Sequence, residues 1–78
     1  MEIGTVTGNI WATRKDAKLE GQKLLIVQTD SGRIVASDTV GAGEGDTVLI
    51  TKGSGARKTA ADDIPIDAAI VGIIDKLL

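Results

Sequence analysis

Apolar side chains gather in five short stretches, and each stretch has the length of a β-strand rather than of a helix. The pattern predicts strands over residues 1–13, 22–29, 33–40, 47–52 and 68–75. Two of these strands, at residues 24–27 and 68–74, are apolar at successive positions instead of alternating. With no long amphipathic helix between them, the five strands predict an all-β domain.

Ten glycines separate these stretches and interrupt any helical period. Gly4 and Gly8, inside the first strand, predict the bends or bulges of a tightly curved sheet. Residues 30–32 (Asp-Ser-Gly) predict a tight hairpin turn, residues 41–46 a loop, and residues 56–63 one short helical turn. We therefore expect a small five-stranded barrel, closed or nearly closed, with at most one short helix.

The two strands that are apolar on both faces indicate that the protein associates with another chain. In a small barrel only one face of each strand looks inward, so the second apolar face of residues 24–27 and 68–74 needs cover from outside. A long helix of the same chain could supply it, but the pattern predicts none. We favour a neighbouring subunit over a loosely covered monomer.

Composition agrees with this view. The 78 residues make one small domain, which buries only about 60% of its unfolded surface. Such domains usually need disulfides, a metal or partner subunits. The sequence has no Cys and no His, which excludes disulfides, zinc sites of the usual kind, and cysteine or histidine catalysis. Association is the remaining means of stabilisation, and we expect no cofactor and no metal.

The charge balance argues against nucleic acid as a partner. Nine Lys and Arg against eleven Asp and Glu give a net charge of −2, and Trp11 is the sole aromatic residue. Nucleic-acid binders normally combine a basic surface with stacking aromatics. The longest apolar run has four residues, and the first residues do not resemble a signal peptide. We expect an intracellular protein without a membrane or nucleic-acid partner.

Two motifs suggest chemistry and do not sustain it. Gly41 and Gly43 begin a dinucleotide-type glycine pattern, but Asp46 takes the place of the last glycine and a strand follows instead of a helix. Ser54 lies between two glycines at the wrong spacing for a nucleophile elbow, and only Lys52 or Lys58 could activate it. We interpret both as turns.

Two further features are charged. The acidic residues at positions 62, 63 and 67 lack the spacing of a dedicated Ca²⁺ site, and we interpret them as a solvated turn. Arg57 follows a glycine turn, and its planar guanidinium group could bind backbone carbonyls or a carboxylate across a subunit boundary. An exposed, solubilising role for Arg57 is an equal alternative.

Five blocks of sequence, in order and nearly end to end, resemble one known family. The blocks are residues 12–21 (ATRKDAKLEG), 23–28 (KLLIVQ), 38–46 (DTVGAGEGD), 53–57 (GSGAR) and 65–75 (PIDAAIVGIID). They are similar to the vertex proteins of bacterial microcompartments, the pentameric shell proteins of carboxysomes and of ethanolamine- and propanediol-type metabolosomes. The resemblance implies an OB-like barrel assembled as a cyclic pentamer in a shell in the bacterial cytoplasm.

The resemblance also implies a role and partners. Such pentamers are structural, are not enzymes, and close the corners of a polyhedral shell whose flat faces are hexameric proteins. Candidate residues for subunit contacts or axial loops, by resemblance, are Gly41, Gly43, Gly45, Gly53, Ser54, Gly55, Ala56 and Arg57. Candidate core or interface positions on the last strand are Ile70, Val71 and Ile73.

Three departures from the family pattern bear on these candidates. Glu44 stands where the family usually has an apolar or neutral residue, and five copies near an axis would repel one another. Gly55 replaces the second serine of Gly-Ser-Ser-Ala-Arg, and the connection at residues 29–32 is short. Two other functions stay open from the residues: an OB-like module that binds a ligand or nucleic acid, and a small enzyme.

Overall fold

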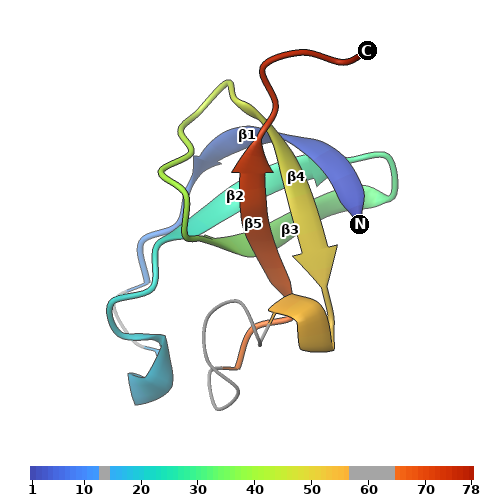
Figure 1. Ribbon diagram of the computed structural model, residues 1–78. Helices are drawn as coiled ribbons and strands as arrows, with labels where there is room; N and C mark the ends of the chain where they lie inside the picture. The colour runs from blue at the N-terminus through green and yellow to red at the C-terminus, as the bar shows by residue number, and fades with distance from the viewer. Residues whose placement is uncertain (13–14, 57–64) are drawn as a thin grey trace.

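The computed structural model describes residues 1–12, 15–56 and 65–78 and forms a closed five-stranded barrel (Figure 1). Around the barrel the strands follow the order β1-β2-β3-β5-β4. This confirms the predicted all-β, OB-like barrel. Residues 54–56 are helical. The elements are β1 (Glu2–Asn9), the 3₁₀ helix η1 (Ala17–Leu19), β2 (Leu24–Thr29), β3 (Gly32–Asp38), β4 (Thr47–Lys52) and β5 (Ala68–Ile73).

The barrel is not antiparallel throughout. β3 and β5 pair in parallel through Ser37–Ala69 and Asp38–Ile70, whereas the other four pairings are antiparallel. A closed ring with an odd number of strands cannot alternate direction at every step, so one parallel pair is unavoidable. The sequence pattern did not specify the direction of this one pairing.

Three strands, β1, β3 and β5, end earlier than predicted. β1 stops at Asn9 instead of residue 13, and the Ile10 N–H makes one more bond, to the carbonyl of Leu24. β3 stops at Asp38 because the Asp38 carboxylate accepts the Val40 N–H and turns the chain. β2 and β5 differ from their predicted limits by two residues, and β4 has the predicted limits.

The charged segment after β1 contains a helix that the pattern did not predict. Asp16 accepts the Lys18 N–H at 2.8 Å and so caps the single turn of η1. Residues 57–63 of the helical turn predicted for 56–63 lie outside the described residues. In the part of the chain that is described, no helix has the length and apolar character needed to cross a membrane.

The core lies inside the barrel and is made of the inward residues of every strand. β2 shows the pattern clearly, since Leu25 and Val27 are fully buried while Leu24 and Ile26 point outward and are half-buried. The largest buried apolar side chains of the core are Val6, Leu25, Val27, Val48, Ile50 and Ile70. Each contributes about 1.5–3 kcal/mol by leaving water.

Two glycines permit the curvature at β1. A Cβ on Gly4 would lie 2.5 Å from Val27 Cγ1 and 2.9 Å from the Gln28 carbonyl, so only glycine allows β1 and β2 to approach this closely. The register shifts between Val6 and Gly8, which confirms the predicted bulge. The hairpin between β2 and β3 turns at residues 30–31, as expected.

Candidate functional site

The two glycine-rich candidate segments lie at opposite ends of the barrel. Residues 41–46 precede β4 and residues 53–56 follow it, so the strand separates them (Figure 1). The structure therefore does not join them into one site within a single chain. Arg57, the last residue of the second segment, lies outside the described residues.

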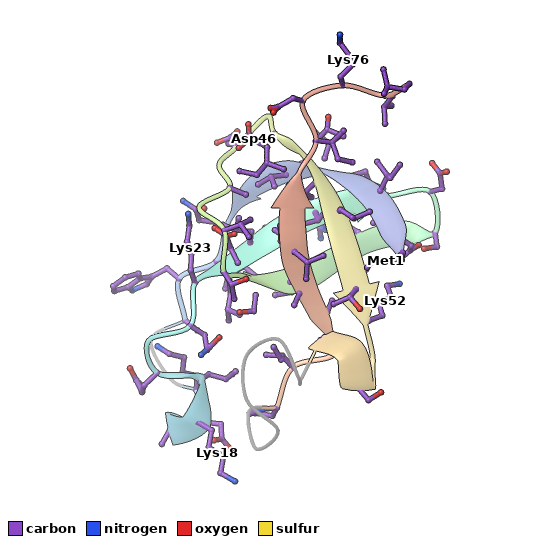
Figure 2. All side chains as sticks on the ribbon, viewed as in Figure 1. Met1, Lys18, Lys23, Asp46, Lys52 and Lys76 are labelled. Carbon is purple, nitrogen blue, oxygen red and sulfur yellow. The ribbon has the colours of Figure 1, made fainter. Side chains whose placement is uncertain are left out.

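The loop at residues 39–46 is fastened to the barrel by Lys23. The Lys23 ammonium donates to the Ala42 carbonyl at 2.8 Å and forms an ion pair with Asp38 Oδ2 at 3.1 Å. Ala42 is 1% exposed and belongs to the core cluster. Figure 2 shows Lys23 directed along the side of the barrel toward this loop. One cation thus fixes both the start of the loop and its middle.

Asp38 is the buried charge of this arrangement, since its side chain is 0% exposed. Burial alone raises the pKa of Asp38, but the Val40 N–H, the Lys23 ammonium and the Ala42 N–H together outweigh it. The pKa of Asp38 therefore lies below its ordinary value. The carboxylate stays ionised at neutral pH and holds the loop in place.

Two glycine N–H groups of the loop bind acceptors of the protein itself rather than facing a ligand. The Gly43 N–H donates to Asp46 Oδ2 at 2.9 Å, and the Gly45 N–H donates to the Val6 carbonyl at 2.9 Å. The positive φ of Gly41 (84°) and of Gly45 (93°) lets the backbone make these closed turns. Glu44 is exposed. The loop is a structural turn and not a phosphate cradle.

Residues 53–56 form a tight turn after β4. Gly53 has a φ of 64°, its N–H donates to the Asp67 carbonyl at 2.8 Å, and its carbonyl accepts the Ala56 N–H. Ala56 is buried and Ser54 is exposed. Lys52, which Ser54 would need as a base, forms an ion pair with Glu2 at 2.6 Å. Lys58, the other candidate base, lies outside the described residues.

The ion pair of Glu2 and Lys52 connects β1 to β4. The Ser31 hydroxyl donates to Glu2 Oε1 at 2.8 Å and so also connects the β2–β3 hairpin to β1. The bond from Lys52 is the main cause that lowers the pKa of Glu2, and the bond from Ser31 is the second. Among the residues that the structure describes, no group of three or more acidic side chains could hold a metal ion.

The three candidate positions on β5 have different environments. Ile70 is 0% exposed and belongs to the core cluster, whereas Val71 is half-buried and Ile73 is 39% exposed. The register of β4 and β5 shifts beside Val71, between Leu49 and Ile50. Of the three, Ile70 contributes to the barrel itself, and Val71 and Ile73 have surface left for a neighbour.

Apolar side chains also form two strips on the outside of the barrel, and the sequence reasoning identified only part of them. We call one the Trp11 strip: Trp11, Leu24, Ile26 and Val35. We call the other the Ile3 strip: Met1, Ile3 and Leu49. The run at residues 24–27 signalled the first strip. The second arises only when Ile3 pairs with Leu49 across β1 and β4.

Comparisons with known proteins agree along nearly the whole chain. A family model described as "Ethanolamine utilisation protein EutN/carboxysome" matches residues 1–75. The microcompartment shell vertex protein GrpN of Rhodospirillum rubrum is 43% identical over 83 residues, which cover 96% of this chain and 93% of GrpN. The shell vertex protein PduN of Salmonella typhimurium is 40% identical over 89 residues, 99% of this chain and 98% of PduN.

Two solved structures have the same barrel. That of CcmL from Nostoc sp. PCC 7120 has a TM-score of 0.92 at 42% identity and covers 99% of this chain and 92% of CcmL. That of the "pentameric microcompartment shell protein" GrpN from Rhodospirillum rubrum has a TM-score of 0.89 at 40% identity, covering 100% of this chain and 98% of GrpN. The chain thus shares its fold and most of its length with proteins of one architectural kind.

Proposed function

The chain belongs to the EutN/CcmL family of microcompartment shell vertex proteins, and we propose that five copies of it form a ring that closes a corner of such a shell. The observation that carries this conclusion is the match of residues 1–75 to the family model. The function is structural, and the protein is located in the shell of a bacterial microcompartment in the cytoplasm.

The geometric reason for a pentamer is that a flat sheet of hexagonal units cannot close on itself. Pentagonal units at the corners introduce the necessary curvature. We propose that the neighbours of this ring are hexameric shell proteins, and that the chain has no catalytic role. The absence of Cys and His from the sequence supports the second point, because the usual nucleophile–base pairs cannot be formed.

A cyclic ring also needs two different contact surfaces on each chain, because its interface is heterologous. We propose that the loop at residues 41–46, the turn at residues 53–57 and the outer positions Val71 and Ile73 contribute to these contacts. The support is the exposure of Gly41 and Glu44 at one barrel end, of Gly53 and Ser54 at the other, and of Ile73 on β5.

Native mass spectrometry over a dilution series tests the proposal. We expect a species of five times the 8.0 kDa chain at micromolar concentration. A single chain at all concentrations would refute the pentamer and with it the vertex function. Arg57→Ala should lower the pentamer fraction more than the matched control Arg33→Ala, and equal fractions for the two would remove Arg57 from the interface.

A further inference from the structure

The two halves of the loop at residues 39–46 are held by different kinds of bond. The second half is held by the main chain of β1, since the Gly45 N–H donates to the Val6 carbonyl and the Val6 N–H donates to the Asp46 carbonyl, both at 2.9 Å. The Gly43 N–H donates to Asp46 Oδ2 and closes the turn. The position of this half therefore follows from the barrel and from the loop itself.

The first half, residues 39–42, which we call the loop arm, depends on side chains outside it. Asp38 Oδ1 accepts the Val40 N–H at 3.0 Å where the arm begins. Where the arm ends, the Ala42 carbonyl accepts a hydrogen bond from the Lys23 ammonium, which also pairs with Asp38 Oδ2. Lys23 thus connects the two ends of the arm to each other and to the start of β2.

The two ends of the arm are buried, and the residues between them are exposed. The Asp38 side chain is 0% and Ala42 is 1% exposed, whereas Val40 is 42% exposed and Gly41 is exposed. A neighbouring molecule can therefore contact Val40 and Gly41 but not the Asp38 carboxylate. Any effect of Asp38 on association must be transmitted through the arm.

We infer that Lys23 is the positioning residue of the loop arm, and that it prepares the exposed part of the arm for assembly of the ring. This inference rests on the proposed function and deepens it. A loop that is ordered before association loses less conformational entropy when it becomes part of an interface. A subunit whose arm is loose binds with an affinity reduced by the fraction of subunits in the competent conformation.

A dilution series followed by native mass spectrometry measures the concentration at which half of the pentamer dissociates. For Lys23→Met this concentration should rise about tenfold, because fewer subunits have the competent arm. Lys18→Met removes the same charge from an exposed position on η1 and should dissociate as the wild type does. Val27→Ala removes two carbon atoms from the core, so it should lower the melting temperature without changing dissociation.

Asp38→Asn separates positioning from direct contact by Lys23, whose side chain is 52% exposed. If Lys23 positions the arm, Asp38→Asn should also raise the dissociation concentration, although its side chain is buried. The double variant should dissociate no more readily than the weaker of the two single variants, because both substitutions loosen the same arm. Circular dichroism verifies folding, and Lys23→Gln, with a polar and uncharged side chain, replaces Lys23→Met if that variant does not fold.

Three results would overturn the inference. Lys23→Met could dissociate like the wild type, Val27→Ala could dissociate as readily as Lys23→Met, or Asp38→Asn could leave dissociation unchanged. The second result would make the effect one of general stability, and the third would make it a direct contact of Lys23. A wild type that is monomeric at every concentration would instead refute the proposed function, so the two failures are distinguishable.

Discussion

Removal of the Lys23 ammonium is expected to loosen one loop of the barrel selectively. In Lys23→Met the side chain keeps its apolar stem but can no longer donate to the Ala42 carbonyl or pair with Asp38. The Asp38 carboxylate then stays buried with only backbone N–H partners. The loop at residues 39–46 loses its connection to β2, while the core of the barrel is unchanged.

The size of the effect follows from these contacts. A hydrogen bond to a charged group contributes about 1.5–3 kcal/mol, and an unpaired buried charge adds to the loss. Because the Lys23 side chain is 52% exposed, water screens part of the attraction, and we adopt about 2 kcal/mol. For a domain of this size that lowers the melting temperature by roughly 10 °C. It also accelerates local opening of the loop roughly thirtyfold.

Hydrogen exchange measures the local part of this prediction. The amides of Val40 and Gly43 should exchange roughly thirtyfold faster in Lys23→Met, whereas Lys18→Met, a substitution at an exposed lysine of η1, should change neither. A double-mutant cycle with Asp38→Asn should give a coupling energy of about 1–2 kcal/mol. Unchanged loop exchange, or a coupling below about 0.5 kcal/mol, would refute the reasoning.

Three other predictions follow from single contacts. In a monomeric variant, Gly4→Ala should lower the free energy of unfolding in urea by about 1–3 kcal/mol, because the new Cβ would lie 2.5 Å from Val27 Cγ1. Gly8→Ala, whose Cβ would have its nearest atom at 3.8 Å, should change the free energy of unfolding by less than about 1 kcal/mol. Gly55→Ser should lower the melting temperature because a Cβ there lies 2.6 Å from Thr51 Oγ1, and adding Thr51→Ala should restore it; no recovery would refute the clash. The pKa of Asp38 is lower in the folded chain than in the unfolded chain, so the ionised carboxylate stabilises the fold fully above pH about 4–5. This stabilisation is lost as the pH falls through the pKa of the folded chain. The urea midpoint of Asp38→Asn should therefore vary less with pH in this acid range than that of the wild type.

The strands could be predicted because their signals are local. Apolar residues at strand spacing located all five, the Asp-Ser-Gly at residues 30–32 located the hairpin, and Gly8 located the bulge. The ends of β1 and β3 could not be predicted. They depend on partners far away in the sequence, such as the Leu24 carbonyl, or on a side chain such as that of Asp38 turning its own backbone.

The candidate site was predictable to a smaller extent. The matching blocks identified the family, and the apolar run at residues 24–27 signalled a covered outer face. The pairing of Ile3 with Leu49, and the contact of Lys23 with Ala42, join residues that only the closed barrel brings together. The exposure of Trp11 is likewise a property of the fold, since a lone tryptophan in a sequence is as readily a core residue as a surface one.

Closure of the barrel also determines how such a chain can associate. Every strand has a neighbour on both sides, so no strand is left with a wholly unpaired edge for another chain to extend, although β3 and β5 share only the pairs Ser37–Ala69 and Asp38–Ile70. In the proposed ring, association then uses mainly side chains on the outer faces, and in a small domain without disulfides these need to be apolar enough to stabilise it. The two apolar faces of residues 24–27 are consistent with the proposed ring, because the outward Leu24 and Ile26 are only half-buried in the single chain. The odd strand number thus forces the parallel pair of β3 and β5, and the proposed ring gives the outward apolar side chains a partner.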